Sequence, residues 1–71
     1  MVAGLRRLRA AAGLTQEQLA AAAREKTPGA RVTASNVAQI ERGVISDPRV
    51  SMLRALAKAL GVSLDDLAGK E

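Results

Sequence analysis

The 71-residue chain has room for one domain (1–71) and contains neither cysteine nor histidine, which excludes disulfide bridges and the usual zinc ligands. The net charge is +4 and no residue is aromatic, so proteins that stack unpaired bases on aromatic rings are disfavoured. No apolar run approaches the ~20 residues of a membrane span, and MVAGLRRLRAAAG lacks the apolar core of a signal peptide, so we expect a cytoplasmic protein without a membrane partner.

Hydrophobic periodicity predicts five helices and no strand, which makes the fold class all-α. The first helix is expected over residues 2–12. Leu5 and Leu8 form its inner stripe. Gly13 follows it, at a position that favours a left-handed backbone and therefore ends the helix.

The second helix is expected over residues 15–25. Thr15 and Gln18 have the spacing of a capping box, in which each side chain bonds the other residue's backbone amide. Its inner face is narrow and built mainly from small residues, which lets a neighbouring helix approach closely; this face comprises Leu19, Ala20 and Ala23.

The third helix is expected over residues 34–42, with Thr33 as its N-terminal cap and Gly43 as its stop. Val37 and Ile40 share one side and anchor the helix. Because successive helical residues rotate by about 100°, a different set points outward. This outer arc carries short polar groups and one arginine, namely Ser35, Ala38, Gln39 and Arg42, with Ala34 at the tip.

The outer arc has two interpretations. Gln39 has the groups to bond an adenine edge in a DNA major groove, and Ser35 can donate or accept. Ala34 or Ala38 suits a thymine methyl, and Arg42 suits a phosphate or a guanine. The alternative is that these side chains are only the solvated face of an amphipathic helix.

Two further helices complete the expected domain, over residues 48–60 and 63–68. Pro48 suits the first turn of the fourth helix, and Gly61 ends it. Ser63 caps the fifth, with Asp65 and Asp66 at its positive end. The fourth helix carries apolar residues at spacings of three and four, namely Val50, Leu53, Leu56, Ala57 and Leu60.

Positive charge is concentrated toward the start of the chain. Residues 1–58 hold ten basic and four acidic residues, whereas residues 59–71 hold Lys70 against Asp65, Asp66 and Glu71. This distribution favours a polyanionic partner that is met away from the C-terminal end. A solvated basic surface with no partner is the alternative.

Four blocks occur in order, each at a predicted helix boundary: LRRLR, GLTQEQLA, VT…V…QIERG, and Pro48 followed by LAKALGVSLDDL. Together they resemble the phage-repressor/Cro-type (XRE) family of helix-turn-helix DNA-binding domains, from about Leu5 to Leu67. The resemblance implies a compact, lambda-repressor-like five-helix domain. Its second and third helices would form the DNA-binding motif.

The resemblance also implies roles for single residues. It places Arg9 in an ion pair with Glu41 that links the first helix to the third; from the residues alone, Arg9 could equally contact a phosphate. It places Gln16 at a phosphate, where its amide joins the helix dipole. The base contacts implied are Ala34, Ser35, Ala38 and Gln39, and the further backbone contacts are Asn36 and Arg42.

The connection between the second and third helices departs from the family. The usual turn has about four residues, and such short turns normally fix the angle between two helices. This chain has about seven extra residues, from Arg24 to Arg31. We hypothesise that Arg24, Lys26 and Arg31 contact the DNA backbone there; a surface loop without a partner is the alternative.

These expectations predict sequence-specific binding to double-stranded DNA by a prokaryotic or phage transcriptional regulator, a repressor in preference to an activator. Such domains usually bind as homodimers on two half-sites, and the dimer would associate with the nucleoid. Exposed apolar residues near Val62, Leu64 and Leu67 are candidates for the dimer contact.

Two other classes of function fit these residues less well. A protein-interaction module on the same fold, antitoxin-like or coactivator-like, would bind a protein tightly and DNA weakly or not at all. An enzyme is not expected, because the chain lacks histidine, cysteine and a phosphate-cradling glycine loop. We therefore expect no catalytic residue, no cofactor, no metal and no small-molecule substrate.

Overall fold

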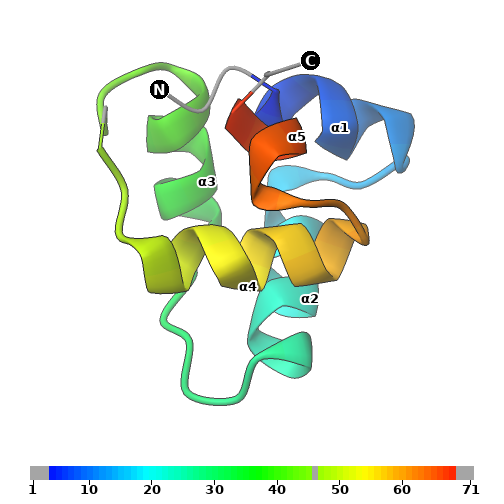
Figure 1. Cartoon of the computed structure of the whole chain (residues 1–71), viewed down its shortest axis with the longest axis vertical. Coiled ribbons are helices and arrows are strands. Elements are labelled where there is room, and N and C mark those ends of the chain that lie inside the picture. Colours follow the sequence, from blue (N-terminus) through cyan, green and yellow to red (C-terminus); the bar gives the residue numbers. More distant parts are fainter. Residues whose placement is uncertain (1–3, 46, 69–71) are drawn as a thin grey trace.

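Five helices make up the described part of the chain, which in this computed structural model comprises residues 4–45 and 47–68 (Figure 1). No strand occurs in those two ranges, so the all-α prediction is confirmed. Residues 2 and 3 of the first expected helix, and Lys70 and Glu71 of the acidic end, lie outside the described residues. The helices are α1 (Leu5–Ala11), α2 (Gln16–Lys26), α3 (Ala34–Glu41), α4 (Val50–Leu60) and α5 (Leu64–Ala68).

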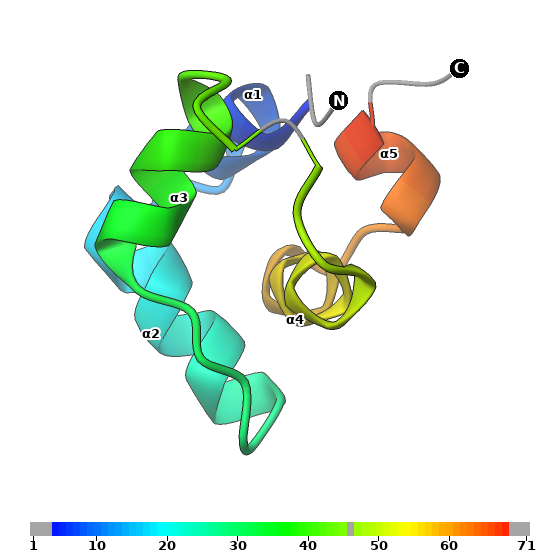
Figure 2. The same ribbon diagram turned by 90° about the vertical axis from the view of Figure 1, so that its left-hand side faces the viewer.

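The helices pack around one core, in two groups that lie on either side of it. In Figure 1, α4 lies across the front of α2, and Figure 2 shows α2 and α3 on one side of the molecule with α4 and α5 on the other. α2 packs against both α3 and α4, and α5 packs against α4 and α1. The Gly4 amide donates to the Leu67 carbonyl at 2.9 Å, which joins the beginning of the described chain to its last helix.

The core is entirely aliphatic. Alanines at the helix contacts, Ala20, Ala23, Ala55 and Ala57, bring backbones close together, so the small core is closed without aromatic rings. The anchors expected on the second and third helices, Leu19, Val37 and Ile40 among them, are buried as predicted. The largest fully buried side chains come from all five helices and one connection, namely Leu5, Leu19, Val32, Val37, Leu56 and Leu67.

Two expectations about the C-terminal half were wrong. α4 begins at Val50 rather than at Pro48, because the capping residue Arg49 is extended (φ −63°, ψ 146°) and the buried Pro48 precedes it. Val50 is 56% exposed, since it lies on the outer side of the first turn. Leu67 is not an exposed dimer contact but part of the core, with 1% of its surface exposed, whereas Leu64 is exposed to 39%.

Short-range signals in the sequence do set the helix ends. Thr15 Oγ1 accepts from the Gln18 amide at 3.1 Å while Gln18 Oε1 accepts from the Thr15 amide at 2.9 Å, which confirms the capping box. Ser63 and Asp66 make the equivalent pair at α5. Gly61 ends α4 with φ 70°, a conformation that glycine adopts without the steric cost of a Cβ atom.

The lengthened connection between α2 and α3 is partly helical. α2 continues to Lys26, so the connection proper runs over residues 27–33. Gly29, at φ 92°, follows Pro28 in the position of a type II turn that requires a positive φ. Val32 is fully buried, and Arg24 Nη1 donates to the Val32 carbonyl at 2.6 Å. The connection is therefore fixed to the core and to α2.

We expect the core to tolerate little loss of volume. Leu56→Ala removes a fully buried side chain at the contact between α4 and α2 and should cost about 2–5 kcal/mol of unfolding free energy. Urea unfolding followed by far-ultraviolet circular dichroism measures this, since the chain has no aromatic fluorophore. Val50→Ala is the matched control on the same helix and should change stability by less than about 0.5 kcal/mol. Equal losses in the two variants would contradict the placement of α4.

Candidate nucleic-acid interface

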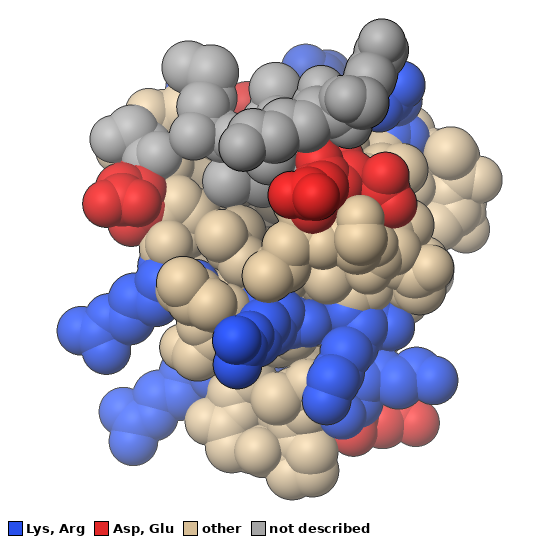
Figure 3. Space-filling view, in the orientation of Figure 1, with Lys and Arg blue, Asp and Glu red and all other residues tan. Residues whose placement is uncertain are grey.

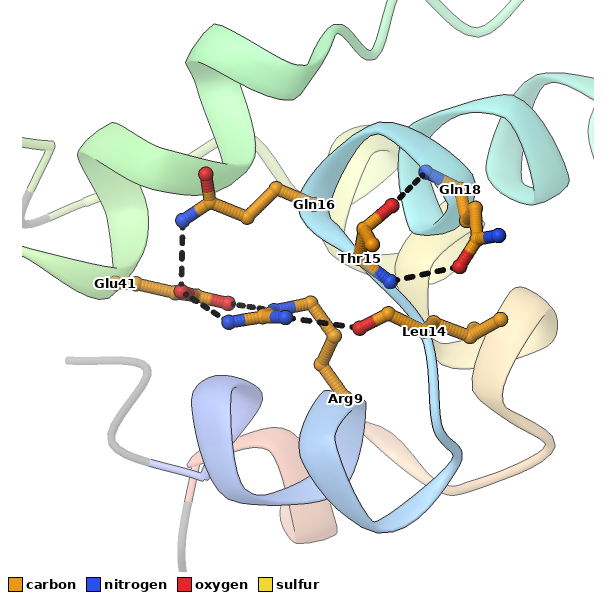
Figure 4. A network of polar contacts seen from close by, with 6 residues as sticks. All are labelled: Arg9, Leu14, Thr15, Gln16, Gln18 and Glu41. Atoms are coloured by element: carbon orange, nitrogen blue, oxygen red, sulfur yellow. Dashed lines mark hydrogen bonds and ion pairs between the residues drawn. The ribbon is translucent and has the colours of Figure 1, made fainter.

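The side chain of Glu41 connects three helices at one edge of the molecule (Figure 4). Arg9 on α1 donates from Nε to Glu41 Oε2 at 2.6 Å and from Nη2 to Oε1 at 3.1 Å. Gln16, the first residue of α2, donates from Nε2 to Oε1 at 3.0 Å. Arg9 Nη1 also donates to the Leu14 carbonyl at 2.8 Å. The end of α3 is thus bonded to α1 and to the beginning of α2.

Burial makes this set of bonds necessary. The Glu41 side chain is only 4% exposed, and a carboxylate removed from water is costly unless its oxygens are paired. Burial alone would raise the pKa of Glu41, but the hydrogen bonds from Arg9 and Gln16, with the charges of Arg9 and Arg6, outweigh it. The net effect is a lowered pKa, so Glu41 remains ionised at neutral pH. The same hydrogen bond raises the pKa of Arg9.

Gln16 has a partner that the sequence did not suggest. It was expected at a DNA phosphate, and the structure directs its amide nitrogen to Glu41 instead. An amide nitrogen carries two hydrogens, so one donor remains for an external acceptor. Any phosphate contact by Gln16 would therefore be made from a side chain already held by α3.

The outer face of α3 carries the five residues expected there. Ser35 and Arg42 are exposed, and Ala34, Ala38 and Gln39 are half-buried. Within the described ranges, the side-chain amide of Gln39 has no hydrogen-bond partner, so its two donors and its acceptor are available to a ligand. Val37 and Ile40 on the opposite side are buried in the core. α3 thus presents a short polar surface on a helix whose inner side is fixed.

Asn36 is part of the cap of α3, and its Oδ1 is already in use. This oxygen accepts from the Thr33 amide and from Thr33 Oγ1, both at 3.0 Å, while Thr33 Oγ1 accepts from the Asn36 amide at 3.2 Å. Only the Nδ2 donors of Asn36 remain for the phosphate contact that was expected of it. The spacing from Thr33 to Asn36 is that of a capping box, so this contact was readable from the sequence.

The three cations expected along the DNA backbone differ in their contacts. Arg24 is bonded to the Val32 carbonyl, where it holds the connection against α2. Lys26 and Arg31 are exposed and make no hydrogen bond or ion pair with another described residue. The local sequence gave no signal for the Arg24 contact, because its partner lies eight residues away across a turn.

Comparison with families of proteins identifies this arrangement. A family model described as helix-turn-helix matches residues 5–67, which is most of the chain. The chain belongs to the phage-repressor/Cro-type helix-turn-helix family. This is a DNA-binding family of transcription regulators. Comparisons with curated proteins and with solved structures gave no significant match. No helix within the described residues is long and apolar enough to cross a membrane.

The ionised form of Glu41 should stabilise this helix-turn-helix domain in a pH-dependent way. Because the pKa of Glu41 is lower in the folded than in the unfolded chain, the stabilisation is full above about pH 4.3 and is lost as the pH falls through the folded value. Glu41→Gln should therefore cost about 2 kcal/mol at neutral pH, by leaving Arg9 without its charged partner.

Urea unfolding of both proteins between about pH 7 and pH 3 tests this prediction. The difference in unfolding free energy should narrow on acidification, since the wild-type carboxyl becomes neutral as well. A difference that stays constant with pH would show that the charge of Glu41 contributes nothing.

Proposed function

We propose that this domain reads the sequence of double-stranded DNA by placing α3 in the major groove. The observation that carries the proposal is the outer face of α3, where Ser35, Gln39 and Arg42 stand beside small alanines. An α-helix with its side chains is about 10–12 Å across, which suits a major groove about 12 Å wide. The methyl groups of Ala34 and Ala38 leave the backbone free to approach the base edges closely.

The proposed contacts divide into two kinds. Gln39 would bond bidentately to an adenine edge, Ser35 would bond a neighbouring base edge, and Ala34 and Ala38 would contact thymine methyls. Arg42, the Nδ2 donors of Asn36 and the second Nε2 hydrogen of Gln16 would bind phosphates. Phosphate contacts position the helix, and base contacts supply the sequence preference. Because Gln16 also bonds Glu41, its phosphate contact would connect the DNA backbone directly to the residue that orients α3.

We further propose that the domain binds DNA as a homodimer and acts as a repressor in the cytoplasm, associated with the nucleoid. The longest dimension of the domain is 28 Å, whereas two half-sites one helical turn apart are separated by about 34 Å, so reading both requires two copies. One short helix contacts few bases, and a second copy multiplies the specificity. A domain of this size acts most simply by occupying a site that RNA polymerase needs.

The two classes of contact on α3 should respond differently to substitution. Gln39→Ala should relax base preference at one position, at a cost of about 1–3 kcal/mol on the preferred sequence. Arg42→Ala should weaken binding to all sequences alike. Selection from random duplex DNA with the wild type and both variants, at two salt concentrations, measures these effects and reveals any palindrome. If neither substitution changes DNA binding, α3 is not the reading helix.

The salt dependence of DNA binding should show whether the connection between α2 and α3 contacts phosphates. If Lys26 and Arg31 each neutralise a phosphate, the double variant Lys26→Ala/Arg31→Ala should reduce the slope of log affinity against log salt by about 1.8. Arg24 is left unchanged, because its removal would free the Val32 carbonyl. Arg54→Ala/Lys58→Ala on α4 is the control of equal charge and should leave the slope intact. An unchanged slope in the first variant would make the connection a surface loop.

A further inference from the structure

A groove runs between the connection of α2 to α3 and the outer side of α4. It consists of two adjoining hollows that share Thr27 and Ser51. The first lies at the beginning of α4, between Pro28 and Met52. The second continues along α4 toward the beginning of α5, where Val62 and Leu64 close it. No residue of the proposed reading face of α3 lines either hollow.

Four cations line this groove and no carboxylate does. The cations are Arg31 and Arg49 at the first hollow and Arg54 and Lys58 at the second. Among the described residues the one ion pair is that of Arg9 with Glu41, so none of these four charges is neutralised by a close partner. Figure 3 shows Lys and Arg as a band across this face, with acidic side chains mainly above it.

The groove also offers apolar contacts, and one unsatisfied polar atom is buried beside it. Its walls include Met52, Val62 and Leu64, and the exposed fraction of Leu64 is 39%. Thr27, which borders both hollows, has a buried hydroxyl oxygen with no hydrogen-bond partner. The first turn of α4 carries neither an acidic residue nor a capping side chain, so its amides add to the positive potential.

Most of the groove lies away from the proposed DNA contact, and the residue that the two share is Arg31 at the first hollow. Figure 2 shows α3 and α4 on opposite sides of the molecule, and Figure 3 shows the face in which α4 lies in front. A duplex placed along α3 would leave the second hollow, with Arg54 and Lys58, away from its phosphates. The phosphates of a duplex also offer no apolar groups for Val62 and Leu64 to contact.

We propose that this groove binds an acidic peptide segment of a partner protein. Carboxylates of the peptide would pair with Arg49, Arg54 and Lys58, and its apolar side chains would lie against Met52, Val62 and Leu64. Cations beside apolar side chains match a peptide that alternates acidic and apolar residues. The proposal does not depend on which DNA sequence α3 reads.

A fluorescein-labelled peptide of alternating Glu and Leu, with Gly spacers for solubility, is the probe, and fluorescence anisotropy measures its binding to the full chain. A peptide with Gln in place of Glu should bind at least about tenfold more weakly, because only the charge differs. Arg54→Glu/Lys58→Glu should cause a comparable loss. Arg7→Glu/Arg42→Glu makes the same change in net charge at exposed residues outside the groove and should retain peptide binding.

DNA binding by the same two variants separates this site from the reading face. Arg54→Glu/Lys58→Glu should lose the peptide and retain most of its DNA affinity, and Arg7→Glu/Arg42→Glu should do the reverse. If both pairs weaken the peptide equally, only net charge is being measured and the groove is not a site. If the α4 pair instead abolishes DNA binding, the groove is part of the DNA interface and the peptide proposal is wrong.

A measurement on the wild type does not depend on the variants folding. Peptide-induced changes in amide chemical shifts should cluster at Thr27, Ser51 and Met52. Changes that cluster on α3 instead would overturn the proposal. Circular dichroism of each variant establishes that it is folded before binding is compared.

Discussion

The position of α3 depends on one buried carboxylate. A helix of eight residues is too short to be stable by itself, so its orientation must come from tertiary contacts. Val37 and Ile40 bury its inner side, but apolar contacts alone permit small rotations and translations. Glu41 removes that freedom, because its two oxygens must meet donors from α1 and α2 at hydrogen-bond distance. The cost of leaving such a group unpaired makes the three helices mutually dependent.

The same arrangement explains how an eight-residue helix can divide its surface between structure and recognition. The inward-facing residues of α3 are either aliphatic or hydrogen-bonded to other helices. The outward-facing residues are therefore not needed to hold the helix in place. Ser35 and Gln39 can therefore differ between related domains without loss of the fold. The cap residue Thr33 holds the beginning of α3 and Glu41 holds its end, so that substitutions of Ser35 or Gln39 act on a helix of fixed position.

Much of this domain could be predicted from the sequence, because the signals at helix ends are local. Thr15 with Gln18 and Gly61 each act within one helical turn, and these predictions were confirmed. The errors concern contacts between distant residues. The short helix that carries Leu67 does not show by itself which of its residues are covered. Leu67 is buried because α5 packs against α1 and α4. The Gln16 and Arg24 contacts are likewise invisible locally, since their partners are brought near only by the fold. The groove along α4 was missed for the same reason.

The connection of α2 to α3 borders both surfaces, since it lines the groove and leads into Thr33. A ligand in the groove could alter DNA binding only if it had different affinities for two arrangements of this connection. The structure opposes a second arrangement: Val32 would have to leave the core, and the bond from Arg24 to its carbonyl would have to break. Exposing a buried valine alone costs about 1.5 kcal/mol or more. The connection should therefore transmit no conformational change between the two surfaces, so that a domain held on DNA by α3 can retain a peptide beside Arg54 and Lys58 on α4.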